Sequence, residues 1–153
     1  MQAQHTEVSR QSPNLFSAEE VAKTIGADLK TVTDWLEVGA IDRAVFGGGH
    51  FSRYELHRAA LVLELVKFGL SPSSAKDVIR DMEYDLQQIW ARSPSSFKAY
   101  LILIPTRRKW LVSWLWKPST EAIDRLPLED HIILPVSDIL ARVTDETKQV
   151  RGY

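Results

Sequence analysis

Signals that begin and end helices recur at short intervals in the first half of this 153-residue chain. Ser17 and Glu20 form a capping box before "AEEVAKTI", and Gly26 stands where a left-handed residue would end that helix. Asp28 is placed to cap "LKTVTDWLEV", and Gly39 follows it. Apolar residues three and four apart share one face of this second segment: Leu29, Val32 and Leu36. The pattern predicts two short helices joined by a tight turn, the size of a helix-turn-helix unit.

Two further helix starts follow. Ser52 and Glu55 form a second capping box before "RYELHRAALVLELVKF", which is apolar over much of its surface and is predicted to be the central core helix. In "SPSS", Ser71 is a cap and Pro72 takes the first helical position. The apolar spacing then continues in register to about Arg92, which predicts one long amphipathic helix.

Beyond the linker-like "RSPSS" at 92–96 the pattern changes from helical to extended. "FKAYLILI" and "KWLVSWLW", separated by "PTRR", predict a β-hairpin with a basic, solvated tip. "HIILP" predicts a third strand and "VSDILARVTDETKQ" a closing helix. Alternate residues of the second strand share one face and are candidates for dimerisation: Trp110, Val112, Trp114 and Trp116. Packing against the closing helix and a pocket for an apolar ligand are the alternatives for this apolar hairpin.

Three of the chain's seven glycines stand together in "FGGGHFS", between Phe46 and Ser52. Consecutive glycines favour a tight bend or a close approach of the backbone to a ligand. A phosphate-binding loop fits poorly, because no Lys-Ser/Thr pair follows and the G-x-G-x-x-G spacing is missing. The position between a helix-turn-helix and a capped helix favours a short two-stranded wing over 43–52, with a plain structural turn as the alternative.

The composition of the chain excludes several classes of function. The chain has no cysteine, so disulfides and thiolate metal sites are excluded, and its net charge is −1. No apolar run approaches the ~20 residues that cross a bilayer, and the polar first residues are not a secretory signal. The four histidines lack the spacing of metal ligands, and no catalytic constellation is apparent. We therefore expect a cytoplasmic protein that is not an enzyme, with no cofactor and no metal.

Residues 15–82 resemble the MerR-type winged-helix DNA-binding domain. "FSAEEVAKTIGADLKTVTDWLEVGAI", the glycine segment and "FSRYELHRAALVLELVKFGLSPSSAKDVI" follow the order of that domain. The resemblance implies a homodimeric transcription regulator from a bacterium or a phage, with a recognition helix at 29–38 in the major groove and the wing on the DNA backbone. The expected fold is α+β: a disordered lead-in at 1–14, a winged helix-turn-helix of about four helices at 15–92, and at 97–153 a module of β-hairpin, strand and closing helix for dimerisation or a protein partner.

The resemblance also indicates which residues would contact double-stranded DNA. Lys30 and Thr31 match a basic residue and a threonine of the family, whereas Thr33 and Asp34 replace a common arginine and tyrosine. Gly49 stands where the family usually has an arginine. The candidate DNA-binding residues, including flanking arginines and the glycine backbone, are Lys30, Thr31, Thr33, Asp34, Arg43, Gly48, Gly49, His50, Arg53 and Arg58.

The charge of this half of the chain argues against strong non-specific DNA binding. Residues 1–80 hold nine Lys plus Arg against ten Asp plus Glu, and phosphate binding normally relies on an excess of cations. Alternatives are a winged-helix adaptor or antagonist that binds protein, and a phage DNA-packaging recognition subunit. If Asp34 and Glu37 face the groove without compensation from Arg43 and Arg53, protein interaction is favoured.

Overall fold

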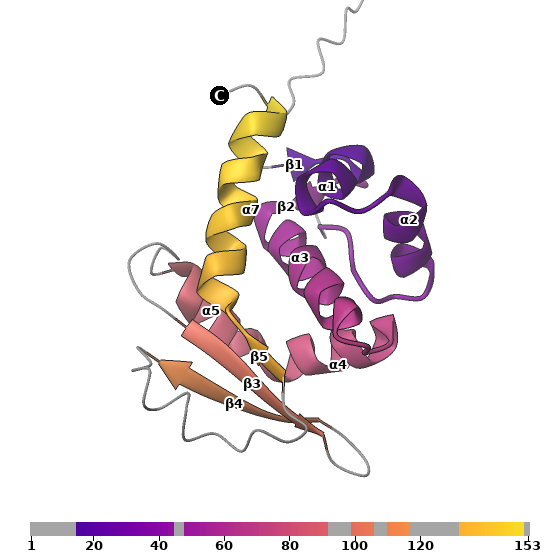
Figure 1. Cartoon of the computed structure of the whole chain (residues 1–153). Coiled ribbons are helices and arrows are strands. Elements are labelled where there is room, and N and C mark those ends of the chain that lie inside the picture. The colour runs from indigo at the N-terminus through magenta and orange to yellow at the C-terminus, as the bar shows by residue number, and fades with distance from the viewer. Residues whose placement is uncertain (1–14, 45–47, 92–98, 106–109, 117–131, 152–153) are drawn as a thin grey trace, which may run out of the picture.

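A computed structural model describes residues 15–44, 48–91, 99–105, 110–116 and 132–151 of the chain. The fold is mixed α+β and mostly helical (Figure 1). Among the described residues, every helix is too short or too polar to span a membrane. In chain order the elements are β1 (Leu15–Phe16), α1 (Ala18–Ile25), α2 (Leu29–Glu37), β2 (Phe51–Ser52), α3 (Arg53–Lys67), α4 (Pro72–Asp81), α5 (Glu83–Ala91), β3 (Ala99–Pro105), β4 (Trp110–Trp116), β5 (Ile132–Leu134) and α7 (Val136–Arg151).

The predicted N-terminal starts of the first four helices are confirmed. Both capping boxes form, because the carboxylates of Glu20 and Glu55 accept hydrogen bonds from the backbone N–H groups of Ser17 and Ser52. The Asp28 side chain caps α2, and Ser71 caps α4, with Pro72 in its first turn. Each cap satisfies a backbone donor that the helix itself leaves unpaired.

The single long helix predicted from Ser71 to about Arg92 is wrong, because the helix breaks at Met82. Its backbone leaves the helical region there, with φ −105° and ψ 9°. The Met82 side chain is buried, as are Leu86 and Ile89 on α5. A change of direction at Met82 thus keeps the apolar residues of both short helices in the core.

The glycine segment differs from the expected two-stranded wing. Phe51 and Ser52 form β2, which pairs antiparallel with Leu15 and Phe16 of β1. Within 43–52, the N–H of Ala44 donates a 2.9 Å hydrogen bond to the carbonyl of His50, which closes the loop. Phe46 and Gly47 lie outside the described residues. Strand pairing therefore joins this segment to the chain before α1.

The predicted strands and closing helix of the second half are confirmed. The sheet order is β4-β3-β5, and both pairs are antiparallel. In central strand β3, Ala99 and the residues from Leu101 to Leu103 are buried and Tyr100 is half-buried, whereas Ile104 and Pro105 at its end are exposed. The residues between the strands, at 106–109 and 117–131, lie outside the described part.

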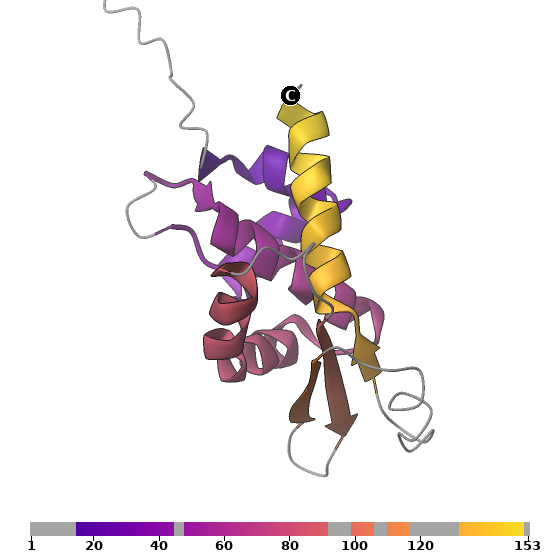
Figure 2. The ribbon, with the colours of Figure 1, turned by 90° about the vertical axis from the view of Figure 1, so that its left-hand side faces the viewer.

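One hydrophobic core runs through both halves of the chain. Helix α7 contacts α1 and α3, and also packs on β3. Figures 1 and 2 show α7 in yellow alongside the N-terminal helices, with the three-stranded sheet at one end of the molecule. Buried residues of α1, α3, β3 and α7 belong to a single cluster. The sequence division at 92–97 is therefore bridged by the core, and the lead-in at 1–14 lies outside the described residues.

Candidate nucleic-acid interface

Helix α2 is anchored to the core by one face and open on the other. Val32 and Trp35 are buried, and Leu36 is half-buried, so burial of Trp35 agrees with a core role. Leu29 was expected on the buried face, but it is 43% exposed. Leu29 is the first residue of α2, one turn before buried Val32. The exposed face is therefore polar, with apolar Leu29 and Val38 at its ends.

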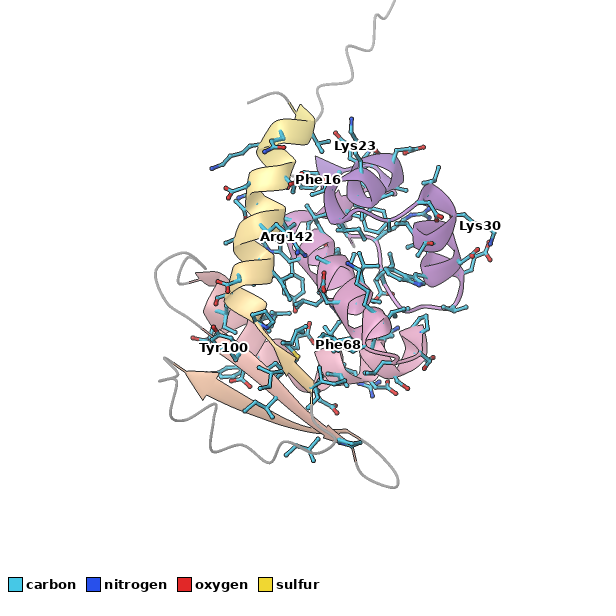
Figure 3. The ribbon with its side chains drawn as sticks, in the orientation of Figure 1. Phe16, Lys23, Lys30, Phe68, Tyr100 and Arg142 are labelled. Atoms are coloured by element: carbon cyan, nitrogen blue, oxygen red, sulfur yellow. The ribbon has the colours of Figure 1, made fainter. Side chains whose placement is uncertain are left out.

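Lys30 and Asp34 lie one turn apart on this exposed face and form an ion pair. The Nζ of Lys30 donates to the carboxylate of Asp34 at 2.6 Å. This hydrogen bond raises the pKa of the Lys30 ammonium. Figure 3 shows the Lys30 side chain projecting away from the body of the protein. The one cation of α2 is therefore neutralised by its own neighbour unless a stronger anion displaces Asp34.

The two predicted threonines make local hydrogen bonds. The N–H of Thr31 donates to the Asp28 carboxylate at 2.8 Å, and hydrogen bonds from the Thr31 side chain and backbone lower the pKa of Asp28. The Thr33 hydroxyl donates to the carbonyl of Leu29. Thr33 is exposed and Thr31 is half-buried. Each hydroxyl oxygen still has acceptor capacity toward a ligand.

The glycine loop presents backbone to solvent. Gly48 and Gly49 have φ values of 57° and 89°, and a Cβ on either would meet nothing within 4 Å. A side chain would therefore meet no steric obstacle at either position, but residues other than glycine rarely adopt this left-handed backbone conformation. This conformation accounts for a glycine at position 49. His50 is exposed beside these glycines, and Arg43 and Arg53 are exposed on the flanks of the loop.

Arg58 is half-buried and takes part in a cluster with Tyr54 and Glu83. Its guanidinium sits 5.6 Å from the centroid of the Tyr54 ring and 3.8 Å from the carboxylate of Glu83. The Tyr54 hydroxyl donates to the same carboxylate at 3.2 Å, and burial raises the Tyr54 pKa. The cluster joins α3 to the first turn of α5. The guanidinium of Arg58 is thus engaged by these two neighbours, and its predicted contact with DNA stays a prediction.

Sequence reasoning missed Lys76. Its Nζ lies 3.5 Å from the point where a Cβ on Gly39 would stand, just beyond the C-terminal end of α2. A cation there is favoured by the partial negative charge of the last helical turn. Because Lys76 comes from α4, no local pattern around α2 could have indicated it.

Charges on the exposed residues of α2 and the loop nearly cancel. Lys30, Arg43 and Arg53 oppose Asp34, Glu37 and Asp42, all of them exposed. Lys76 adds one cation beside Gly39. In the described part of the chain, Asp34 is compensated by Lys30 and not by the arginines of the loop. The surface has hydrogen-bonding groups for base edges and phosphates, but no dominant positive field.

The four residues predicted for dimerisation lie at alternate positions of β4. Their cross-strand neighbours on β3 are Pro105, Leu103, Leu101 and Ala99, of which the last three are buried. The side chains of Trp110, Val112, Trp114 and Trp116 lie outside the described part. Their role at an interface stays a prediction.

No protein-family model matches the chain, and no curated protein matches its sequence. In the described ranges, no three His, Asp or Glu residues are grouped as metal ligands would be.

Proposed function

We propose that this chain is a cytoplasmic, sequence-specific DNA-binding transcription regulator of the winged helix-turn-helix type, and that it acts as a homodimer. The recognition helix is α2, predicted at 29–38, which enters the major groove. The glycine loop at 43–52 is the wing and approaches the DNA backbone. The proposal rests on the resemblance to the MerR-type domain together with the exposed polar face of α2.

The observation that carries the proposal is that α2 is fixed to the core by one face and exposes the other to solvent. Asp28 caps its start, Val32 and Trp35 fix it to the core, and the opposite face offers Lys30, Thr33 and Asp34 to solvent. A helix of this width fits the major groove of B-DNA. A phosphate or guanine edge can replace Asp34 as the partner of Lys30, and Asp34 can accept from a cytosine amino group.

The near-neutral surface fits specific binding by a dimer better than strong non-specific binding. Few phosphate contacts mean a shallow dependence of affinity on salt. Two weak half-site contacts can still give useful affinity when a dimer engages both at once. We therefore expect a two-fold symmetric operator with half-sites one or two helical turns apart.

Selection of duplex DNA from a random pool at near-physiological salt tests the proposal. Enrichment of a symmetric motif is the expected result. Lys30→Ala should bind the selected DNA more weakly, whereas Lys67→Ala, which removes a lysine paired with Glu64 on α3, should bind it normally. If the folded protein enriches nothing, the proposal is overturned.

The second candidate function is a winged-helix adaptor or antagonist that binds another protein. It is favoured by the Lys30–Asp34 pair and by exposed Leu29 and Val38, because a neutral face with apolar edges resembles a protein interface. A phage DNA-packaging recognition subunit would use the same surface on DNA. A failed DNA selection, followed by loss of a captured protein upon Leu29→Ser substitution, would support the adaptor.

A further inference from the structure

The two edge strands of the three-stranded sheet differ in length. Strand β5 covers only three residues of β3, whereas β4 pairs with β3 along all seven of its residues. In the sheet order β4-β3-β5, the outer edge of β4 faces no other strand of the described chain. A seven-residue edge offers a row of backbone donors and acceptors to any strand that lies beside it.

Strand β4 lacks the usual protection against such pairing. Proteins protect edges with short strands, charged residues or proline. From Trp110 to Trp116 the sequence is "WLVSWLW", which contains no charged residue and no proline. The other edge, β5, is protected by its short length. Of the two edge strands in the described part of the chain, β4 is therefore the one whose own length and residues give no protection.

The order of residue types in β4 is also nearly the same in the forward and the reverse direction. About Ser113, the positions pair as Trp110 with Trp116, Leu111 with Leu115, and Val112 with Trp114. Antiparallel pairing of two identical strands places these positions opposite each other if the two-fold axis passes through the centre of the strand. Aromatic and aliphatic cross-strand pairs stabilise a sheet, and the smallest residue falls on the axis.

We propose that two copies of this chain associate through antiparallel pairing of their β4 edges, with Ser113 of each copy beside the two-fold axis. The result is a continuous six-stranded sheet in the order β5-β3-β4-β4-β3-β5. This inference rests on the homodimer of the proposed function, but not on DNA binding. It assigns the contact to the backbone edge of β4, in place of the tryptophan face that the sequence analysis favoured.

A heterologous peptide fits the edge less well than a second copy. An isologous contact requires that a surface be complementary to itself, and the near-palindromic order of residue types in β4 meets that requirement. An unrelated strand would gain the same backbone hydrogen bonds but would not explain this order. The second copy is therefore the partner that the sequence specifies.

The absence of cysteine makes the register directly testable. Ser113→Cys is a nearly isosteric change, and two opposed strand positions lie about 4.5–5.5 Å apart, within the reach of a disulfide. The full-length variant is expected to form a covalent dimer under mild oxidation. Ser73→Cys, at an exposed position on α4, is the matched control and should stay largely uncrosslinked.

Two further variants fix the register and do not depend on the behaviour of position 113. Leu111→Cys and Leu115→Cys should each crosslink poorly alone, because the two copies of either position lie roughly 14 Å apart at ~3.4 Å per residue. An equimolar mixture should crosslink efficiently, because position 111 of one copy faces position 115 of the other. Equal crosslinking of Leu111→Cys alone, or no gain in the mixture, overturns the proposed register.

Sedimentation of the unmodified protein completes the test. A dimer is expected, and a monomer at every concentration at which the protein stays in solution overturns the proposal. A dimer whose Ser113→Cys variant does not crosslink overturns the β4 contact while leaving the homodimer in place. Since no DNA is present, these results are separate from the outcome of the DNA selection.

Discussion

The guanidinium of Arg142 on α7 donates a 2.9 Å hydrogen bond to the carboxylate of Glu64 on α3, although the two residues lie 78 positions apart. Figure 3 labels Arg142 at the place where these helices meet. The Glu64 side chain is only 16% exposed, and it also accepts from Lys67 at 3.4 Å. This ion pair joins the closing helix to the helices of the proposed DNA-binding half.

Removing Arg142 should cost a small but measurable part of the stability. Because its guanidinium is half-exposed, we expect Arg142→Ala to lower the free energy of unfolding by about 0.5–1 kcal/mol in urea titrations. Arg80→Ala is the matched control, since Arg80 pairs with Asp77 between two exposed side chains of α4. Equal effects of the two substitutions would contradict a stabilising role for the contact between α3 and α7.

Shortening Leu101 should destabilise the whole protein. Leu101 is fully buried at the centre of β3, within the core that α1, α3 and α7 share. Leu101→Ala should cost about 2–5 kcal/mol, whereas Ile104→Ala on the same strand, 40% exposed, should cost less than ~1 kcal/mol. Tryptophan fluorescence and far-ultraviolet circular dichroism should give one coincident unfolding transition. Two separated transitions would mean that the halves unfold independently.

His57 should make the protein less stable in mild acid. Burial, with a smaller effect of Arg53, lowers the pKa of His57 to about 4. In the unfolded chain it is ~6.5, so between these values the unfolded state binds the proton more tightly. The contribution of neutral His57 to the free energy of unfolding is complete above pH ~6.5. It is lost as the pH falls toward 4, and the total loss is about 3 kcal/mol.

Comparison of the native protein with His57→Gln isolates this effect from the titration of carboxylates. Urea titrations between pH 4 and 7 should show a shallower loss of stability in the variant. Proton NMR should show no titration of the His57 ring in the folded protein above pH ~5. A ring that titrates near pH 6.5 in the folded state would contradict the burial argument.

Two cations of the proposed interface should set the salt dependence of DNA binding. For the double variant Lys30→Ala with Arg53→Ala, the slope of log K against log salt should decrease by roughly one unit per lost phosphate contact. Fluorescence anisotropy with the selected operator measures it. Arg80→Ala, which removes an exposed arginine on α4, should keep the native slope. If the double variant also keeps it, neither residue contacts phosphate.

Asp34 should oppose phosphate binding while it holds Lys30. Asp34→Asn removes the negative charge and leaves a side chain of the same shape, so non-specific DNA affinity should rise several-fold at low salt. Glu37→Gln, one turn further along α2, separates a general charge effect from the loss of the ion pair. A decrease in affinity for a particular operator would instead indicate that Asp34 accepts from a cytosine.

The N-terminal starts of the helices could be predicted because the capping signals are local. A capping box depends on residues three apart, and each of the boxes at Ser17 and Ser52 lies within one helical turn. The strands of the second half were predictable for a similar reason, since alternation and apolar runs are read within a few residues.

Tertiary contacts determined what the sequence did not reveal. The break at Met82 follows from the burial of Met82, Leu86 and Ile89 in a core assembled from distant segments. Strand β2 pairs with strand β1, and the paired residues lie 35 and 37 positions apart in the sequence. Arg58 looked like a surface cation, but it is half-buried and lies against Glu83 and Tyr54. None of these partners lies within the window of a local pattern.

Because α7 packs against α1 and α3, the helices that precede it cannot be moved into a fusion protein without it. A fusion protein that carried only residues 15–91 would bring along the apolar surface that α7 covers, and would leave it facing water. Such a graft is expected to aggregate or to bind chaperones. A transferable unit has to include the distant helix as well.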